Sequence, residues 1–409
     1  MITKSKYSII QLHAALTLFG YWCVHSVVTL FSGGSSRLVS IGYDVFQLVL
    51  STYVIAICFR DIISTRKKAY LTIYSILLLL YSARMFLDMW GGPYIGQLPQ
   101  SAFMNDILQT VFHTFLGAWA MIASVRYLNI DRIVKWTFYL GLIAVLCAFV
   151  SLRTGGIDIS YEEERLSYGG GLGTLALVKI GAIEVIAALH IVLNSKKGKL
   201  FYLAGGGLGL WICFASGSRG GIVGLVIALL FFWLMSSRRN VLLSVIAIVG
   251  VILFIINLEP ILIWLGDFFP ILSRRMLNTI LEHDEGNREL LRQAAYDRIW
   301  ENPIFGYSYR LRADLTGYGC HNGILDFTLA LGIPAGIVFA VSVYGWGIIM
   351  AARMMINKRL FFPSVMAIFA FTASMTGNAT DGVFCFAVVL LAAAYYYNSG
   401  ENRITGASA

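Results

Sequence analysis

Apolar stretches long enough to cross a lipid bilayer recur from one end of this chain to the other. A helix needs roughly 20 apolar residues to cross about 30 Å of hydrocarbon. Inside lipid, each backbone N–H and C=O must be satisfied within its own segment, so these stretches should all be helices. We expect twelve spans, over residues 8–31, 43–59, 69–90, 106–128, 136–152, 174–194, 200–216, 221–237, 241–258, 323–350, 360–376 and 383–397.

The composition agrees with this pattern, since 58% of the 409 residues are apolar, 13% are charged and the mean hydropathy is +0.74. The fold class we expect is an all-α polytopic membrane protein, formed by a single membrane domain over residues 1–409. The first span is too long for a removable signal peptide and lacks a small-residue cleavage site, so we expect it to be retained.

The connections between the spans alternate in charge. Those on one side, together with the two termini, hold 18 Lys and Arg, whereas the short connections on the other side hold only Arg37, Arg153, Arg165 and Arg219. The positive-inside rule then places both termini in the cytoplasm. The net charge of +9 belongs mostly to the cytoplasmic rim, where it faces anionic lipid, and it does not indicate nucleic-acid binding.

One connection is far longer than the others. Residues 259–322, between the ninth and tenth spans, form a 64-residue loop with seven arginines and no lysine. The topology places this loop subdomain on the outer side, because long loops escape the positive-inside rule. Its first part, residues 259–269, has the Trp and Phe content of a segment that lies at the membrane boundary.

A helix is predicted further along the loop, over residues 288–301, with Asn287 as its cap and Asn302-Pro303 after its end. At 100° per residue, Arg288 and Arg292 lie one turn apart on the face that also holds Ala295 and Ile299. Two adjacent guanidinium groups indicate an anion between them. The alternative is a solvated helix whose arginines pair with its own acids.

A second arginine site is predicted at the tight turn Ser216-Gly217-Ser218-Arg219-Gly220-Gly221, between the seventh and eighth spans. Backbone N–H groups at the start of the eighth span, together with Arg219, would form an outward anion site. The alternative is an arginine that only anchors the helix at the interface. In the loop before the sixth span, Glu162 to Glu164 precede Arg165 and are expected mainly to neutralise nearby arginines.

His321 opens the tenth span on the same outward side. An unperturbed imidazole titrates near pH ~6.5, which suits a general base for a hydroxyl nucleophile. The alternative is a polar residue of the interface belt. The other histidines show no metal-ligand spacing, so we expect no metal site. Five of the six cysteines lie within spans and Cys320 has no evident partner, so we expect no disulfide.

Charged residues also occur inside the spans. Arg84 and Asp88 are four positions apart near the outer end of the third span and should pair. Lys179 and Glu184 lie deep in the sixth span, where ionisable side chains are costly and are functional candidates. These two residues are the main support for a transporter as an alternative function.

Three segments together resemble the O-antigen ligase and Wzy O-antigen polymerase superfamily of bacterial envelope glycan assembly. They are the turn at 216–221, the run from Asn287-Arg288-Glu289-Leu290-Leu291-Arg292 to Asn302-Pro303-Ile304-Phe305-Gly306, and His321-Asn322-Gly323 with Gly332 after nine residues. Ala335 departs mildly from the ligase form of the last pattern. The segment from Arg165 to Gly171 is similar to an earlier outward loop of the family, as is the arrangement of twelve spans with one large, partly helical periplasmic loop between helices 9 and 10.

The resemblance implies a GT-C-like glycosyltransferase of the bacterial inner membrane, active at the periplasmic face. The donor would be an oligosaccharide on undecaprenyl diphosphate, with no cofactor, metal or nucleotide sugar. The acceptor would be another lipid-linked repeat or the lipid A core sugar, membrane lipids would surround the site, and a chain-length regulator is a further candidate partner.

In this interpretation the catalytic residues are His321, Arg288 and Arg219. Diphosphate and glycan binding would involve Arg165, Arg292, Ser218 and Asn322. Arginine suits a diphosphate because its planar fork pairs bidentately with phosphate and stays charged. His321 would take the proton from the acceptor hydroxyl, and displacement would invert the anomeric carbon.

Polymerase and ligase differ in their acceptor. Arg288 and His321 are 33 residues apart, shorter than the insertion expected of ligases, and this favours a polymerase over an O-antigen ligase. A polysaccharide transporter or flippase would use Lys179 and Glu184 but leaves the arginines unexplained. A scaffold subunit of an export complex would need none of these residues.

Overall fold

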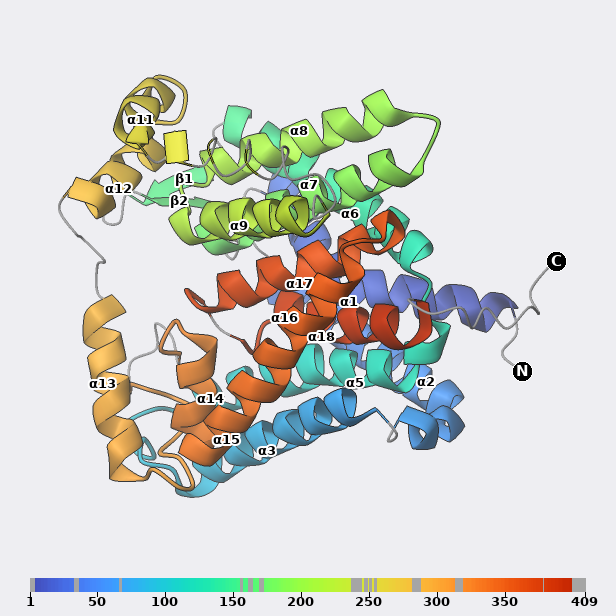
Figure 1. Cartoon of the computed structure of the whole chain (residues 1–409). Coiled ribbons are helices and arrows are strands. Elements are labelled where there is room, and N and C mark those ends of the chain that lie inside the picture. The colour runs from blue at the N-terminus through green and yellow to red at the C-terminus, as the bar shows by residue number, and fades with distance from the viewer. Residues whose placement is uncertain are drawn as a thin grey trace. The chain divides into compact units, whose positions relative to one another are not determined.

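The computed structural model describes residues 4–32, 37–65, 68–154, 157–160, 165–168, 173–236, 256–281, 288–312, 319–377 and 379–398, with residues 245, 249 and 252–253. Within these ranges the chain is almost entirely helical (Figure 1). Seven of the helices in this part of the chain are long and apolar enough to cross a membrane, namely Lys4–Phe31, Leu38–Phe59, Ala69–Gly91, Ile130–Thr154, Thr174–Asn194, Arg219–Ser236 and Ile333–Met354. The polytopic membrane class is therefore confirmed, and the number twelve stays a prediction.

The chain divides into two compact units, each described here by itself. Unit 1 comprises Met1–Thr17, Gln47–Ile133 and Leu290–Ala409, and unit 2 comprises Leu18–Phe46 and Val134–Glu289. Helices with residues in both units include α1 (Lys4–Ser32), α2 (Arg37–Thr65) and α6 (Ile130–Thr154). The long loop contributes α11 (Leu258–Gly266) and α12 (Pro270–Leu281) to unit 2, and nearly all of α13 (Arg288–Glu301) to unit 1.

Unit 1 is organised around α18 (Gly382–Ala393), whose residues after the first are all buried. A helix that is apolar on every side belongs in the interior of a bundle. Its neighbours include α17 (Phe361–Ser374), α16 (Trp346–Met354), α5 (Leu116–Ala123) and α3 (Ala69–Gly91). The chain ends its described part in the short π-helical segment η5 (Ala394–Asn398).

Two predicted spans of unit 1 are not regular helices. The fourth consists of α4 (Gln100–Ile107), the π-helical η1 (Leu108–Phe115), α5 and the short η2 (Val125–Tyr127). The tenth, predicted over 323–350, is broken at Gly332, which separates α14 (Gly323–Leu331) from α15 (Ile333–Val338), η3 (Phe339–Gly345) and α16. Gly332 has φ +88°, and a Cβ there would overlap the carbonyl of Ile304, so the neighbouring segment requires both the break and the glycine.

In unit 2, α7 (Thr174–Asn194) and α8 (Lys199–Ala215) lie side by side over most of their length, and α9 (Arg219–Ser236) packs on both. A Cβ on Gly181 of α7 would overlap the carbonyl oxygen of Gly209 of α8. Glycines at this contact therefore permit the close approach of the two helices. The predicted ninth span, 241–258, lies mostly outside the described residues.

Unit 2 also holds two short strands that the all-α prediction missed. β1 (Ile157–Ser160) pairs antiparallel with β2 (Arg165–Tyr168), with Ile157 opposite Tyr168 and Ser160 opposite Arg165. Both strands alternate apolar and polar residues, which is the period of a strand. Glu162 to Glu164, which connect them, lie outside the described residues.

Candidate functional site

The turn between α8 and α9 is as tight as predicted, with only Ser216-Gly217-Ser218 between the two helices. Ser216 Oγ donates to the carbonyl oxygen of Cys213 (2.7 Å) and accepts from the N–H of Ser218 (3.3 Å). Gly217 adopts φ +66° and lies against Ile271 of α12. Ser218 is buried, and its carbonyl accepts from Ile222, so that Arg219 becomes the first residue of α9.

Arg219 and Arg275 hold this turn and α12 together. Arg219 Nη1 donates to the carbonyl oxygen of Arg275 (2.9 Å), and Arg275 Nη1 donates to the carbonyl oxygen of Gly217 (3.1 Å). The two guanidinium groups are thereby brought to the N-terminus of α9, where backbone N–H groups favour an anion. Sequence reasoning missed Arg275, since nothing in the run Arg274-Arg275 shows which element it reaches.

Two of the other three arginines of the predicted site, Arg165 and Arg288, are placed here by their backbones. Arg165 begins β2, and β2 packs against α7. Arg288 begins α13, so the predicted helix over 288–301 is confirmed. Asn287, its predicted cap, lies outside the described residues.

The predicted arginine face of α13 points inward beyond its first turn. Ala295 and Ile299 are buried in a cluster with Leu311, Cys320 and Leu329. Arg292 lies one turn before Ala295 on the same face and is half-buried, which is not the placement of a fully solvated arginine. The cluster thus brings the arginine face of α13 and the segment leading to His321 together within unit 1.

His321 is exposed and has φ +56°, the one positive φ among the non-glycine residues of the described ranges. Left-handed backbone costs free energy in such residues, and backbone strain of this kind clusters at active sites and ligand-binding segments. Its two neighbours fix this conformation. Asn322 Oδ1 caps α14 by accepting from the N–H groups of Ile324 and Leu325 (both 3.1 Å), and the N–H of Cys320 donates to Asp326 Oδ1 (2.6 Å).

The surroundings of Asn322 and Cys320 show what these two residues do beside His321. Asn322 was predicted to bind substrate, and the structure shows its side-chain oxygen used as the helix cap. Burial raises the pKa of the Cys320 thiol, so this cysteine is a neutral core residue and does not supply a thiolate nucleophile beside His321.

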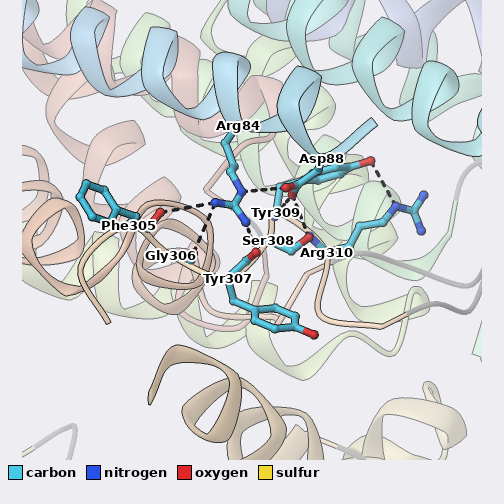
Figure 2. Close-up of polar contacts among 8 residues, drawn as sticks. All are labelled: Arg84, Asp88, Phe305, Gly306, Tyr307, Ser308, Tyr309 and Arg310. Atoms are coloured by element: carbon cyan, nitrogen blue, oxygen red, sulfur yellow. Dashed lines mark hydrogen bonds and ion pairs between the residues drawn. The ribbon is translucent and has the colours of Figure 1, made fainter. Parts of the chain in front are cut away.

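Beside this segment lies a buried ionic network that sequence analysis found only in part (Figure 2). The predicted pair is confirmed, with Arg84 Nε 2.8 Å from Asp88 Oδ1. Asp88 Oδ2 also accepts from Ser308 Oγ and from the N–H of Tyr309, both at 2.8 Å. Arg84 in turn donates to the carbonyl oxygens of residues 305, 306 and 307.

The second half of the network was not predicted. Asp106 Oδ2 accepts from Arg310 Nε and from Tyr309 Oη, both at 2.8 Å, and Arg310 is buried. Burial also raises the pKa of Tyr309, which keeps its hydroxyl as a donor. Tyr94 Oη donates to the carbonyl oxygen of Leu311 (2.6 Å). Residues 305–311 are therefore fixed to α3 and α4 on both sides of Tyr309.

Glu184 is the most unusual charged residue of unit 2. It lies in the middle of α7, is fully buried, and neither of its oxygens has a hydrogen-bond partner within the described part of the chain. A Cβ on Gly141 would overlap its carboxyl group, and one on Gly205 would lie 3.3 Å from it. Glycines of α6 and α8 thus leave room for this side chain.

Comparison with known proteins gives one family match. Residues 204–340 match the family model described as O-antigen ligase. A comparison with curated proteins gives no match. The matched segment includes Ser218, Arg219, Arg288, Arg292, His321 and Asn322. Arg165 precedes the segment and is not part of the match. The predicted resemblance to the O-antigen ligase superfamily is therefore confirmed over this segment of the chain.

Proposed function

Because residues 204–340 match the O-antigen ligase family, we propose that the chain is an inner-membrane glycan transferase acting at the periplasmic face. It polymerises oligosaccharide repeat units carried on undecaprenyl diphosphate, without a metal ion, and with inversion at the anomeric carbon. The alternative within the family is a ligase that transfers the lipid-linked glycan to lipid A core.

One observation carries this proposal. A single family match covers both the turn that presents Arg219 and the strained residue His321 at the start of α14. At both places the structure combines a backbone with positive φ with a side chain suited to anion binding or proton transfer.

The chemistry assigns a role to each residue. The acceptor hydroxyl oxygen attacks the anomeric carbon of the donor, the bond from that carbon to the diphosphate oxygen breaks, and undecaprenyl diphosphate leaves with the bonding electrons. His321 takes the hydroxyl proton as general base. Arg219 and Arg288 stabilise the negative charge on the leaving group.

The remaining predicted residues would support these steps. Arg165 and Arg292 add contacts to the diphosphate or glycan. Ser218 shapes the turn that presents Arg219, and Asn322 holds His321 through the cap of α14. Arg275 joins this group because it binds the same turn.

The test is to express His321→Ala, Arg219→Ala and Arg288→Ala in a strain lacking the protein and to analyse the surface polysaccharide on a gel. Loss of a general base or of an oxyanion partner lowers the rate by roughly 10²-fold or more, so we expect the ladder to disappear. A polymerase then leaves one repeat on lipid A core, and a ligase leaves none.

Two controls sharpen this test. Arg298→Ala removes an exposed arginine of α13 that pairs with Glu301, and it should leave the ladder intact. Arg219→Lys keeps the charge but loses the fork, so it should restore only part of the activity. Wild-type ladders from all three alanine variants would refute the site assignment.

A transporter is the candidate of another class, and Glu184 is the observation that favours it, since carriers use buried carboxyl groups in their spans. Glu184→Gln keeps the shape of the side chain. Loss of polysaccharide in this variant, with normal activity of the three variants above, would support transport over transfer.

A further inference from the structure

The end of α13 and the turn that follows it expose three large apolar side chains close together in sequence. Trp300 is 70% exposed, Ile304 is 62% exposed and Phe305 is 76% exposed. A cluster of this kind on a soluble loop would be unfavourable in water and marks a contact surface. The segments of unit 1 beside these three side chains indicate what contacts them.

On one side the turn adjoins the start of a candidate membrane span. The N–H of Ile333 donates to the carbonyl oxygen of Pro303 (2.7 Å), and Ile333 is the first residue of the span Ile333–Met354. That span exposes Ile337 and Val341, the apolar side chains expected to face lipid.

On the other side the turn adjoins α3, also a candidate span. Arg84 of α3 donates to the carbonyl oxygens of Phe305 (3.5 Å) and Gly306 (3.3 Å). The same helix exposes Leu87 and Trp90 nearer its end. The backbone of residues 303–306 is therefore hydrogen-bonded to two candidate spans, at the start of one of them.

The backbone of this turn is suited to an apolar environment. The N–H groups of residues 305–309 all have acceptors: Asn302 for Phe305 and Gly306, Leu329 for Tyr307 and Ser308, and Asp88 for Tyr309. Irregular backbone is tolerated at membrane depth only when its polar groups are satisfied by protein. A loop that remains in water does not need such pairing.

We propose that Trp300, Ile304 and Phe305 insert into the lipid leaflet on the side of α13, with acyl chains as the occupant of this surface. Trp at the boundary and Ile and Phe below it match the preference of these side chains for the interface and the hydrocarbon. The insertion holds the end of α13 at a fixed depth relative to α3 and α15. It does not depend on the proposed function.

The test places a polarity-sensitive fluorophore at Phe305→Cys in the full chain, in a Cys147→Ser background because the other native cysteines are buried. The protein is reconstituted in phosphatidylethanolamine–phosphatidylglycerol vesicles. We expect several-fold stronger quenching by nitroxide on lipid acyl chains, and several-fold weaker quenching by aqueous iodide, than at the control site Gln293→Cys. Gln293 is exposed on the same helix, away from the turn.

Two outcomes would overturn the proposal. Iodide quenching at position 305 equal to that at position 293 would show that the turn stays in water. Protection from both quenchers would show that another protein surface covers it. Ile304→Cys repeats the measurement at a second exposed position, in case the label at 305 perturbs the turn.

Discussion

At the scale of single residues, removing one partner of the buried pair of Asp106 and Arg310 is predicted to destabilise the protein strongly. Both side chains are more than nine-tenths buried, with Nη2 of Arg310 2.5 Å from Oδ2 of Asp106. Asp106→Asn leaves a buried guanidinium without its counter-charge, which costs about 3 kcal/mol or more of unfolding free energy. Denaturant unfolding of the purified protein in detergent measures the loss.

The exposed pair of Arg298 and Glu301 is the matched control. Glu301→Gln breaks an ion pair whose side chains are nearly half exposed, so the loss should stay below about 1 kcal/mol. Equal losses of unfolding free energy for the two variants would show that burial of the Asp106 pair does not increase its contribution to stability.

Some of these residues could be found from sequence and others could not. Arg84 and Asp88 are one helical turn apart, so their pairing follows from helix geometry. Asp106 and Arg310 are 204 positions apart, and only the folded chain joins them. Arg219 was predicted because it lies in a short loop on the outward side, where lysine and arginine are rare. Its partner Arg275 could not be predicted, because only the folded chain places α12 against this turn.

At the scale of elements, the contact of α7 with α8 depends on glycine. Gly181→Ala would force a methyl group against the carbonyl of Gly209, and overpacking of this kind costs typically 1–3 kcal/mol. Gly207→Ala is the control, because a Cβ there meets nothing within 4 Å. Thermal unfolding should separate the two variants, and equal midpoints would argue against the close packing of these helices.

Helix positions were predicted best where a continuous pattern has clear ends. The predicted spans 69–90 and 174–194 and the loop helix 288–301 agree with α3, α7 and α13 within one residue. The break at Gly332 was missed because the apolar pattern continues through it. Its cause is the segment around Ile304, which packs there from 28 positions away.

At the scale of the whole molecule, the expected topology can be tested by cysteine labelling. The connection between α7 and α8 should face the cytoplasm, and the connection after α3 should face the periplasm. In intact spheroplasts a membrane-impermeant maleimide should therefore label Gln97→Cys but not Lys197→Cys, both at exposed positions. Labelling of Lys197→Cys alone would reverse the assigned orientation and place the arginine turn inside the cell.

Residues 303–308 pack closely against the helix break at Gly332, and this packing limits where residues can be inserted into the chain. The carbonyl oxygen of Leu329 accepts from the N–H groups of Tyr307 and Ser308. Gly306 lies against the backbone of Ala330, and Gly332 lies against the backbone of Ile304. One inserted residue between Pro303 and Ser308 would shift every one of these pairings out of register. Epitope tags or reporter domains should therefore be accommodated in the turn at Gln97, which is exposed, and rejected between Pro303 and Ser308.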